Sequence, residues 1–268
     1  MKISFYRWMA KNQRAARILL SSFLIIAYTV LLYIILDWHL LPVIILDLFL
    51  WFMTLCYVSS ASNMLIKKPM KELSDNCDPY PFLKETEAIL EYDKANKVTD
   101  PAHIINYCAA LSETGEYQKA IDILNTVNID KYALLNLKAV YYHNLSSAYH
   151  ELEKYEMADI FFNRALQVYS DMRNDKIKRS LDNNMIALKA DHYFRLGEYQ
   201  KTLDILDLPA ASTKIQNVSR AFSCALAYIK LNDLDNAKAK LLFVVENGNK
   251  LYVAAQAKRL LDELNSKA

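Results

Sequence analysis

The chain has 268 residues, of which 53% are hydrophobic and 23% charged, and it contains only three glycines and six prolines. So few helix-breaking residues argue against a fold rich in sheets or loops and favour long helices joined by short turns. The formal net charge is +2; the basic excess lies in residues 1–66, and residues 67–268 are nearly neutral. This charge balance gives no electrostatic reason to expect nucleic acid as a partner.

Two apolar stretches near the N-terminus predict a pair of membrane-spanning helices. Residues 18–36 contain no charged side chain, and residues 40–58 contain a single one, Asp47. At about 1.5 Å per residue, each stretch forms a helix close to the thickness of a bilayer's hydrocarbon core. Only residues 37–39 separate the two stretches, so we expect a tight antiparallel transmembrane hairpin over residues 18–58.

The flanking charges predict the orientation of this hairpin. Lysine and arginine side chains precede the first stretch and follow the second, whereas the connecting turn has none. By the positive-inside rule, both ends are cytoplasmic. We therefore expect a multi-pass protein of the cell membrane, with a basic cytoplasmic or interfacial segment at residues 1–17 and a cytoplasmic C-terminal domain. A cleaved signal peptide is the competing interpretation, but the apolar region is long for one and a second span follows directly.

Asp47 is unusual because it lies within the second predicted span. A carboxylate at mid-span costs about 2.5 to 3.5 kcal/mol on insertion scales, so such a residue usually faces protein or water. One interpretation is a contact with a membrane helix of a partner. The other is that Asp47 lies near enough to the turn to reach water, or pairs with a serine or threonine of the first span.

Internal repetition begins after a linker at residues 59–81. The segment GEYQKAIDIL at residues 115–124 recurs as GEYQKTLDIL at residues 197–206, with eight of ten positions identical. Each copy follows an apolar-periodic segment and places a glycine between one helix and the amphipathic run after it. Two weaker copies begin at Glu153 and Asn232. The four segments predict successive helix–turn–helix units.

The spacing of small and large residues around these segments resembles the tetratricopeptide repeat family. The small residues are Cys108, Ser146, Ala190 and Ala225 in the first helices, and Ala120, Ala158, Thr202 and Ala237 in the second helices. The large residues that follow them are Leu111, Tyr149, Tyr193 and Tyr228, and then Leu124, Phe162, Leu206 and Leu241. Small residues opposite large ones let neighbouring helices interlock.

The resemblance covers roughly residues 101–250 and implies an all-α fold. We expect two transmembrane helices followed by an α-solenoid of about four tetratricopeptide-type helix pairs, with the repeat domain at residues 82–268. Helices over residues 85–96 and 252–264 are expected to cap the two ends, because a solenoid needs terminal elements with a polar outer face.

In this family, ligands are usually held in the concave groove by exposed positions on the first helix of each unit. The resemblance implies a groove that includes Asn106, His143, Asn144, Ser147, His150, Asn184, Asp191, Phe194 and Arg195. This mainly polar lining suits a protein or peptide better than a hydrophobic cofactor. Some of these side chains are equally well explained as solvating the groove or bonding to each other. The family's clamp for a terminal carboxylate is not implied, because Ile105 and Ala109 stand at its lysine and asparagine places.

The sequence shows no pattern for catalysis. It has no glycine-rich phosphate loop and no HExxH, CxxC or nucleophile-elbow motif. Its four widely spaced cysteines predict free buried thiols in a reducing compartment. We therefore expect no enzyme activity, no cofactor, no metal and no small-molecule substrate. The expected function is that of a membrane-anchored adaptor that binds an unidentified protein or peptide; the alternative is a structural subunit of a membrane complex assembled mainly through the hairpin.

Overall fold

The computed structural model divides into two compact units, Met1–Pro69 and Met70–Ala268. It describes residues 22–25, 27–29, 48–49, 51–53, 56, 66–95, 97, 100–132, 134–208 and 213–266. Within these ranges, none of the helices combines the length and the apolar character needed to cross a membrane. The segment 1–17, most of the predicted hairpin 18–58 and Asp47 lie outside the described residues.

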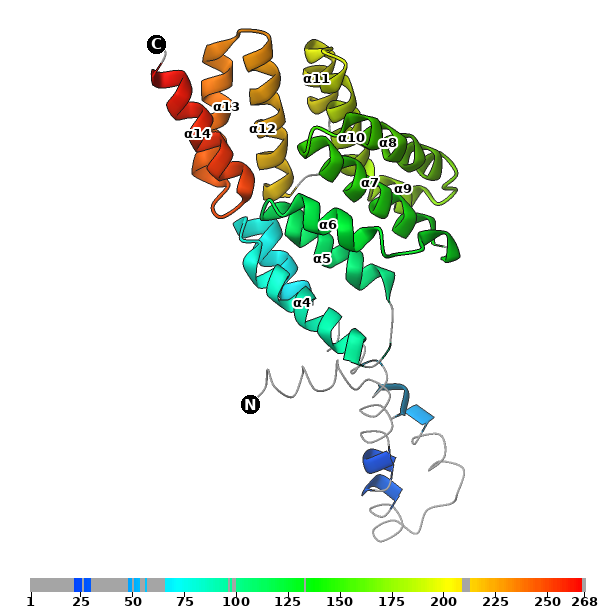
Figure 1. Ribbon diagram of the computed structural model, residues 1–268. Helices are drawn as coiled ribbons and strands as arrows, with labels where there is room; N and C mark the ends of the chain where they lie inside the picture. The colour runs from blue at the N-terminus through cyan, green and yellow to red at the C-terminus, as the bar shows by residue number, and fades with distance from the viewer. Residues whose placement is uncertain are drawn as a thin grey trace. The chain divides into compact units, whose positions relative to one another are not determined.

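The described part of the second unit is built of helices and contains no strand (Figure 1). Its principal helices are α4 (Tyr80–Ala95), α5 (Pro101–Glu113), α6 (Tyr117–Leu124), α7 (Leu135–Glu151), α8 (Tyr155–Ser170), α10 (Asp182–Arg195), α11 (Tyr199–Leu206), α12 (Lys214–Lys230), α13 (Leu234–Asn247) and α14 (Tyr252–Ser266). Two shorter elements, the 3-10 helix η1 (Ile129–Lys131) and α9 (Asp175–Arg179), lie between repeat units. Residues 66–76, within the predicted linker, are also helical.

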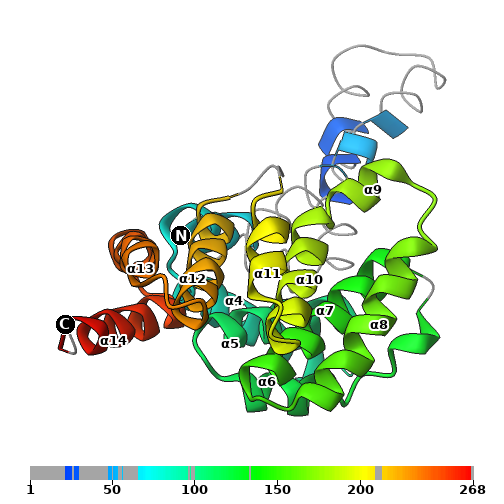
Figure 2. The ribbon, with the colours of Figure 1, turned by 90° about the horizontal axis from the view of Figure 1, so that it is seen from above.

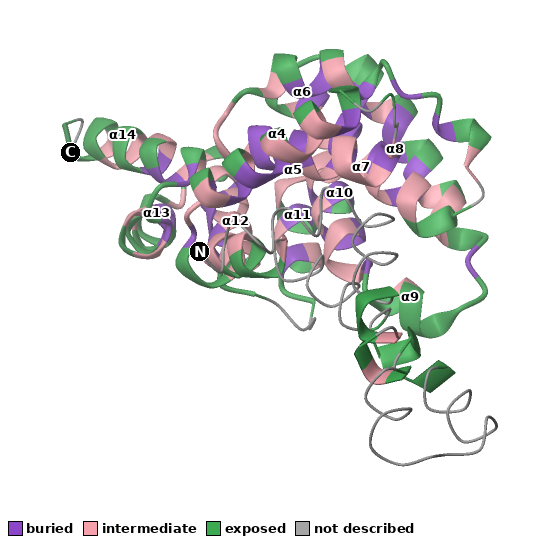
Figure 3. Ribbon diagram, turned by 90° about the horizontal axis from the view of Figure 1, so that it is seen from below, coloured by how far each residue is buried: buried purple, intermediate pink, exposed green. Residues whose placement is uncertain are grey.

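The helices form the repeat pairs that the sequence predicts. The pairs are α5–α6, α7–α8, α10–α11 and α12–α13, and their first helices pack in succession, α5 on α7, α7 on α10 and α10 on α12. Helix α4 packs against α5 and α14 against α13, as expected of capping helices. Figures 1 and 2 show α12, α13 and α14 side by side beyond α11. Most of α14 is exposed or half-buried (Figure 3), which fits a terminal element.

The same turn joins the two helices of every pair. Its left-handed residue is Gly115, Glu153, Gly197 or Asn232, with φ of 84°, 56°, 75° and 59° in chain order. In each turn, the next amide donates a hydrogen bond of 2.9 Å to the carbonyl five residues back. These bonds satisfy helix-end carbonyls. The two turns without glycine therefore keep the geometry of the two turns that have it.

Small residues at the helix crossings permit close packing within each pair. In the second unit, the Ser146 hydroxyl donates to the Ala158 carbonyl at 2.9 Å; in the third unit, the Thr202 hydroxyl donates to the Ala190 carbonyl at 3.5 Å. None of the eight predicted small positions is more than 1% exposed. The small residues therefore lie buried where the paired helices pack, and a larger side chain at these places would force the helices apart.

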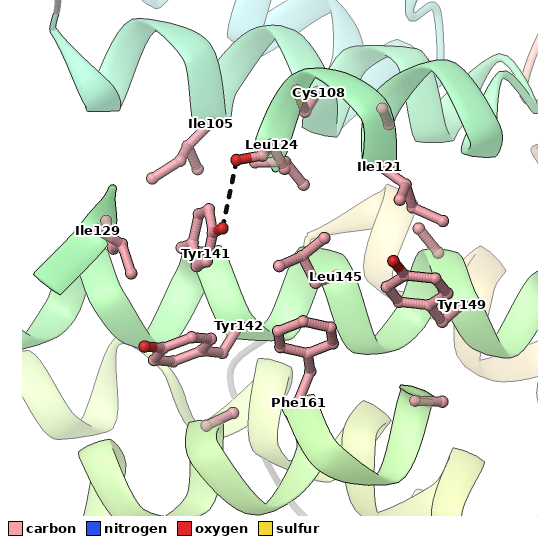
Figure 4. Packing of buried hydrophobic residues seen from close by; sticks show 14 of the residues in the cluster. Ile105, Cys108, Ile121, Leu124, Ile129, Tyr141, Tyr142, Leu145, Tyr149 and Phe161 are labelled. Atoms are coloured by element: carbon pink, nitrogen blue, oxygen red, sulfur yellow. Dashed lines mark hydrogen bonds between the residues drawn. The ribbon is translucent and has the colours of Figure 1, made fainter. Parts of the chain in front are cut away.

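The largest group of buried side chains, which we call the front core, lies among the first two repeat units and α10 (Figure 4). Leu124 and Leu145 are 0% exposed there. The Tyr141 hydroxyl donates to the Leu124 carbonyl at 3.2 Å, which satisfies a buried polar group. The Phe161 ring of α8 stacks on the Tyr149 ring of α7, with centroids 5.6 Å apart.

A second group, the rear core, joins the beginning and the end of the second unit. Cys77, which precedes the first repeat, is 0% exposed and lies in one cluster with Val218 and Phe222 of α12 and Leu241 of α13. The Lys250 amide donates to the Cys77 carbonyl at 3.2 Å. The chain just before α4 therefore packs on the last repeat pair, far from its position in the sequence.

Candidate functional site

The nine predicted groove residues lie on the first helices of the first three repeat units. They are Asn106 on α5; His143, Asn144, Ser147 and His150 on α7; and Asn184, Asp191, Phe194 and Arg195 on α10. None is fully exposed: eight are half-buried and Asn144 is buried. They therefore share partial burial on three successive first helices.

Asn144 ties two first helices together. Its amide nitrogen donates to the Ile105 carbonyl of α5 at 3.4 Å, and its oxygen lies 3.2 Å from Nδ1 of His143. Burial lowers the pKa of His143, although the bond to Asn144 and the charge of Asp191 act in the opposite direction. His143 is therefore mainly neutral at neutral pH, and Asn144 is held by the fold.

Arg195 also makes its polar contacts within the protein. Its side chain is only 4% exposed, and Nη2 donates to the Asp159 carboxylate of α8. His192 contacts the same carboxylate at 3.1 Å and stacks on Phe162, with centroids 4.4 Å apart. Burial opposes ionisation of Asp159, but the bonds from Arg195 and His192 hold its pKa below the usual value. This network fastens α10 to α8.

His150, Asp191 and Phe194 come together between α7 and α10. Nε2 of His150 lies 3.9 Å from the Asp191 carboxylate, and both side chains are mostly buried. The His150 ring meets the Phe194 ring edge-on at 6.3 Å and the Tyr155 ring at 5.9 Å. Tyr199 packs on the other side of Phe194, at 5.3 Å. These contacts bring together a carboxylate, an imidazole and aromatic rings from four helices.

Two glutamates that the sequence did not point to lie at the C-terminal ends of α5 and α7. Burial raises the pKa of Glu113, the last residue of α5, to about 7. Glu151, the last residue of α7, is exposed at the surface of the repeat domain. Desolvation of its carboxyl group by the surrounding protein, together with the charges of Asp191 and Glu113, raises the pKa of Glu151, and a hydrogen bond from Tyr117 opposes the shift.

These two glutamates could have been found in the sequence by aligning the four repeat units. Glu113, Glu151, Arg195 and Lys230 are the final residues of the four first helices. They stand at the same place in each unit, at the C-terminal end of the first helix. Comparing this place across the four units shows that its charge changes from acidic in the first two units to basic in the last two.

The repeat domain can also be compared with known proteins. Residues 88–246 match the family described as the SusR N-terminal TPR domain, where TPR denotes the tetratricopeptide repeat. The chain belongs to this family. No curated protein and no solved structure matches it.

The part that matches the SusR N-terminal TPR domain family covers the predicted groove residues and leaves out both ends of the second unit. It runs from within α4 to near the end of α13, and therefore includes all nine predicted groove residues and both glutamates. Helix α14 and the residues before α4 lie outside it. A TPR domain is typically an interaction module, so the family supports protein binding as the general function of this domain.

The thiols are free, as predicted, but they are not all buried. Cys77 and Cys108 are buried, Cys224 is half-buried and Cys56 is exposed. Burial raises the pKa of Cys108 to about 12, which makes that thiol inert. Within the described ranges, no three histidine, cysteine or acidic side chains are placed to hold a metal ion.

Proposed function

We propose that the chain is a membrane-anchored adaptor whose repeat domain binds a protein or peptide segment in the groove formed by α5, α7 and α10. The observation that carries this proposal is that a TPR-family domain presents half-buried polar and aromatic side chains on three successive first helices. Such a lining offers hydrogen-bonding groups and ring faces to an extended or helical segment. His143, Ser147, His150 and Asp191 are the proposed contacts.

The proposed membrane anchor is the hairpin at residues 18–58. Its support is the two uncharged or nearly uncharged stretches and the basic flanks. Among the described residues of this segment, Phe23 is 71% exposed, Leu48 62% and Phe52 59%. Large apolar side chains exposed in water are unfavourable, and a lipid environment removes that cost. The anchor would keep the repeat domain at the cytoplasmic surface and raise its effective concentration for other membrane proteins.

Site-specific photo-crosslinking tests the groove. A photoreactive amino acid at Ser147 should crosslink one discrete partner in native membranes. The same group at Lys189, an exposed residue of the groove-forming helix α10, is the matched control and should not. The pair His143→Ala and Asp191→Ala should abolish the Ser147 crosslink. Asn144 and Arg195 are left intact because their bonds hold helices together.

The outcomes separate the adaptor from the alternative of a complex subunit. Equal crosslinking from Ser147 and Lys189, or a Ser147 crosslink that survives the double substitution, would show that the groove is not the binding site. If instead Asp47→Leu disperses a membrane complex while groove variants leave it intact, assembly through the hairpin is the function. Resistance of the chain to extraction from membranes at alkaline pH checks the anchor itself.

A further inference from the structure

The segment Leu73–Asp78, which we call the strap, is held against the last repeat pair. Leu73 packs on the edge of the rear core, and Cys77 is fully buried within it. The strap follows the proposed membrane hairpin in the chain and leads directly into α4. It therefore links the helices α12 to α14 to the part of the chain that precedes the repeats.

Polar contacts hold the strap from the loop between α13 and α14. The side-chain amide nitrogen Nδ2 of Asn249 donates to the Asn76 backbone carbonyl at 2.8 Å. The Lys250 backbone amide donates to the Cys77 carbonyl at 3.2 Å, and its ammonium group lies 2.6 Å from the Asp78 carboxylate. The Lys250 side chain is 55% exposed, so this ion pair is screened by water. The strap is thus fixed by one buried thiol and a few bonds near the surface.

The backbone on both sides of this contact is strained. Cys77 has φ of +53°, and Asn249 has φ of +45°. Cys77 occupies the left-handed position after a helix, with the Asp78 amide bonded to the Glu72 carbonyl at 3.2 Å. Glycine is usual at such a position because a β-carbon is unfavourable there. The strain at Cys77 is maintained by burial of its thiol, and release of the strap would relieve it.

Helix α14, which packs on the last repeat pair, also contacts the first repeat unit. The Tyr252 ring of α14 meets the Tyr117 ring edge-on at 5.9 Å. It also covers Gly115 so closely that a β-carbon there would lie 2.6 Å from the ring. The Tyr117 hydroxyl group interacts with Glu151, and the charge of Glu113 also acts on it. Tyr252 therefore lies over the turn between α5 and α6.

We propose that the strap is a releasable latch, which holds α12, α13 and α14 in the closed position and whose release lets Tyr252 leave Gly115. The latch and α14 both lie outside the matched TPR range at residues 88–246. The proposal depends on the proposed function only for its purpose, the control of access to the groove. The opening step itself needs no partner and is tested without one.

Thiol labelling of the full-length chain tests the latch, because Cys77 and Cys108 are both 0% exposed and both have a raised thiol pKa. Cys77 becomes accessible when the strap leaves the rear core, whereas Cys108 lies in the front core and needs wider unfolding. Labelling measured peptide by peptide should modify Cys77 at least about tenfold faster than Cys108. Equal rates, with equal dependence on denaturant, would overturn the proposal. Hydrogen exchange at the Lys250 amide provides a readout that does not depend on thiol chemistry.

Two variants test what the strap controls. Lys250→Ala removes the ion pair at its end and should raise Cys77 labelling about two- to fivefold without changing Cys108. Lys201→Ala, which removes a similarly exposed pair with Glu198, is the matched control and should change neither rate. Tyr252→Ala should also accelerate Cys77 labelling, because the closing contact and the latch are coupled. If Tyr252→Ala leaves Cys77 labelling unchanged, the strap does not control the contact of Tyr252 with Gly115. That conclusion would hold whether or not Ser147 crosslinks a partner.

Discussion

The two repeat-turn glycines offer a matched test of whether α14 closes over the first repeat. Gly115 and Gly197 have φ of 84° and 75°, so an alanine at either place is strained by about 1 to 2 kcal/mol. A β-carbon at Gly197 would meet no atom within 4 Å, whereas one at Gly115 would lie 2.6 to 2.8 Å from three atoms of the Tyr252 ring. Overpacking of this kind typically adds about 1 to 3 kcal/mol.

Gly115→Ala should therefore lower the free energy of unfolding by about 2 to 5 kcal/mol, and Gly197→Ala by only about 1 to 2 kcal/mol. Denaturant unfolding followed by circular dichroism measures both. In the background of Tyr252→Ala, the excess cost of Gly115→Ala should disappear, which a double-mutant cycle detects as coupling. Equal costs at the two glycines, or no coupling to Tyr252, would show that Tyr252 does not rest on this turn in solution.

Three further predictions concern the core, the α8–α10 network and pH. Leu145→Ala should cost about 2 to 5 kcal/mol in denaturant unfolding, while Leu196→Ala, at an exposed site, should cost under about 0.5 kcal/mol; similar costs would contradict the burial. Arg195→Ala should lower the thermal midpoint by removing the guanidinium bond to the Asp159 carboxylate of α8, whereas Lys201→Ala should leave it nearly unchanged. Because burial raises the pKa of Glu113 from 4.5 to about 7, the folded state binds more protons than the unfolded state. Stability should fall as pH rises across this interval, and Glu113→Gln should flatten that slope.

The repeat architecture could be predicted because its determinants are local. A small residue at a helix crossing contacts the other helix of its own repeat unit, as the bond from Ser146 to Ala158 shows. The sequence of that unit is therefore enough to predict it. The turn positions could likewise be found from Gly115 and Gly197, and the structure extends the same turn to Glu153. Since each unit contacts mainly its neighbours, a pattern that repeats in sequence repeats in space.

For the predicted groove, the sequence could indicate only which residues share a helix face. The repeat pattern gives the side of the helix on which a residue lies, but not the atoms that its side chain contacts. Asn144 and Arg195 share the predicted face, yet their side chains bond to Ile105 and Asp159 within the domain. Glu113 and Glu151 were missed because a single glutamate at a helix end is ordinary. Their raised pKa values come from burial at Glu113 and from desolvation and neighbouring charges at Glu151, which only the packed structure supplies.

The contacts of the strap could not be predicted from the repeat pattern. Asn249 and Asn76 are bonded although they are 173 residues apart, and neither belongs to a repeat unit. In a solenoid whose units contact only their neighbours, the first and last elements would not meet. Here they share the rear core through Cys77, at a strained backbone position that local preference would assign to glycine. A residue that contradicts its local preference but is fully buried marks a place where distant contacts determine the structure, and at such a place we expect the latch to act.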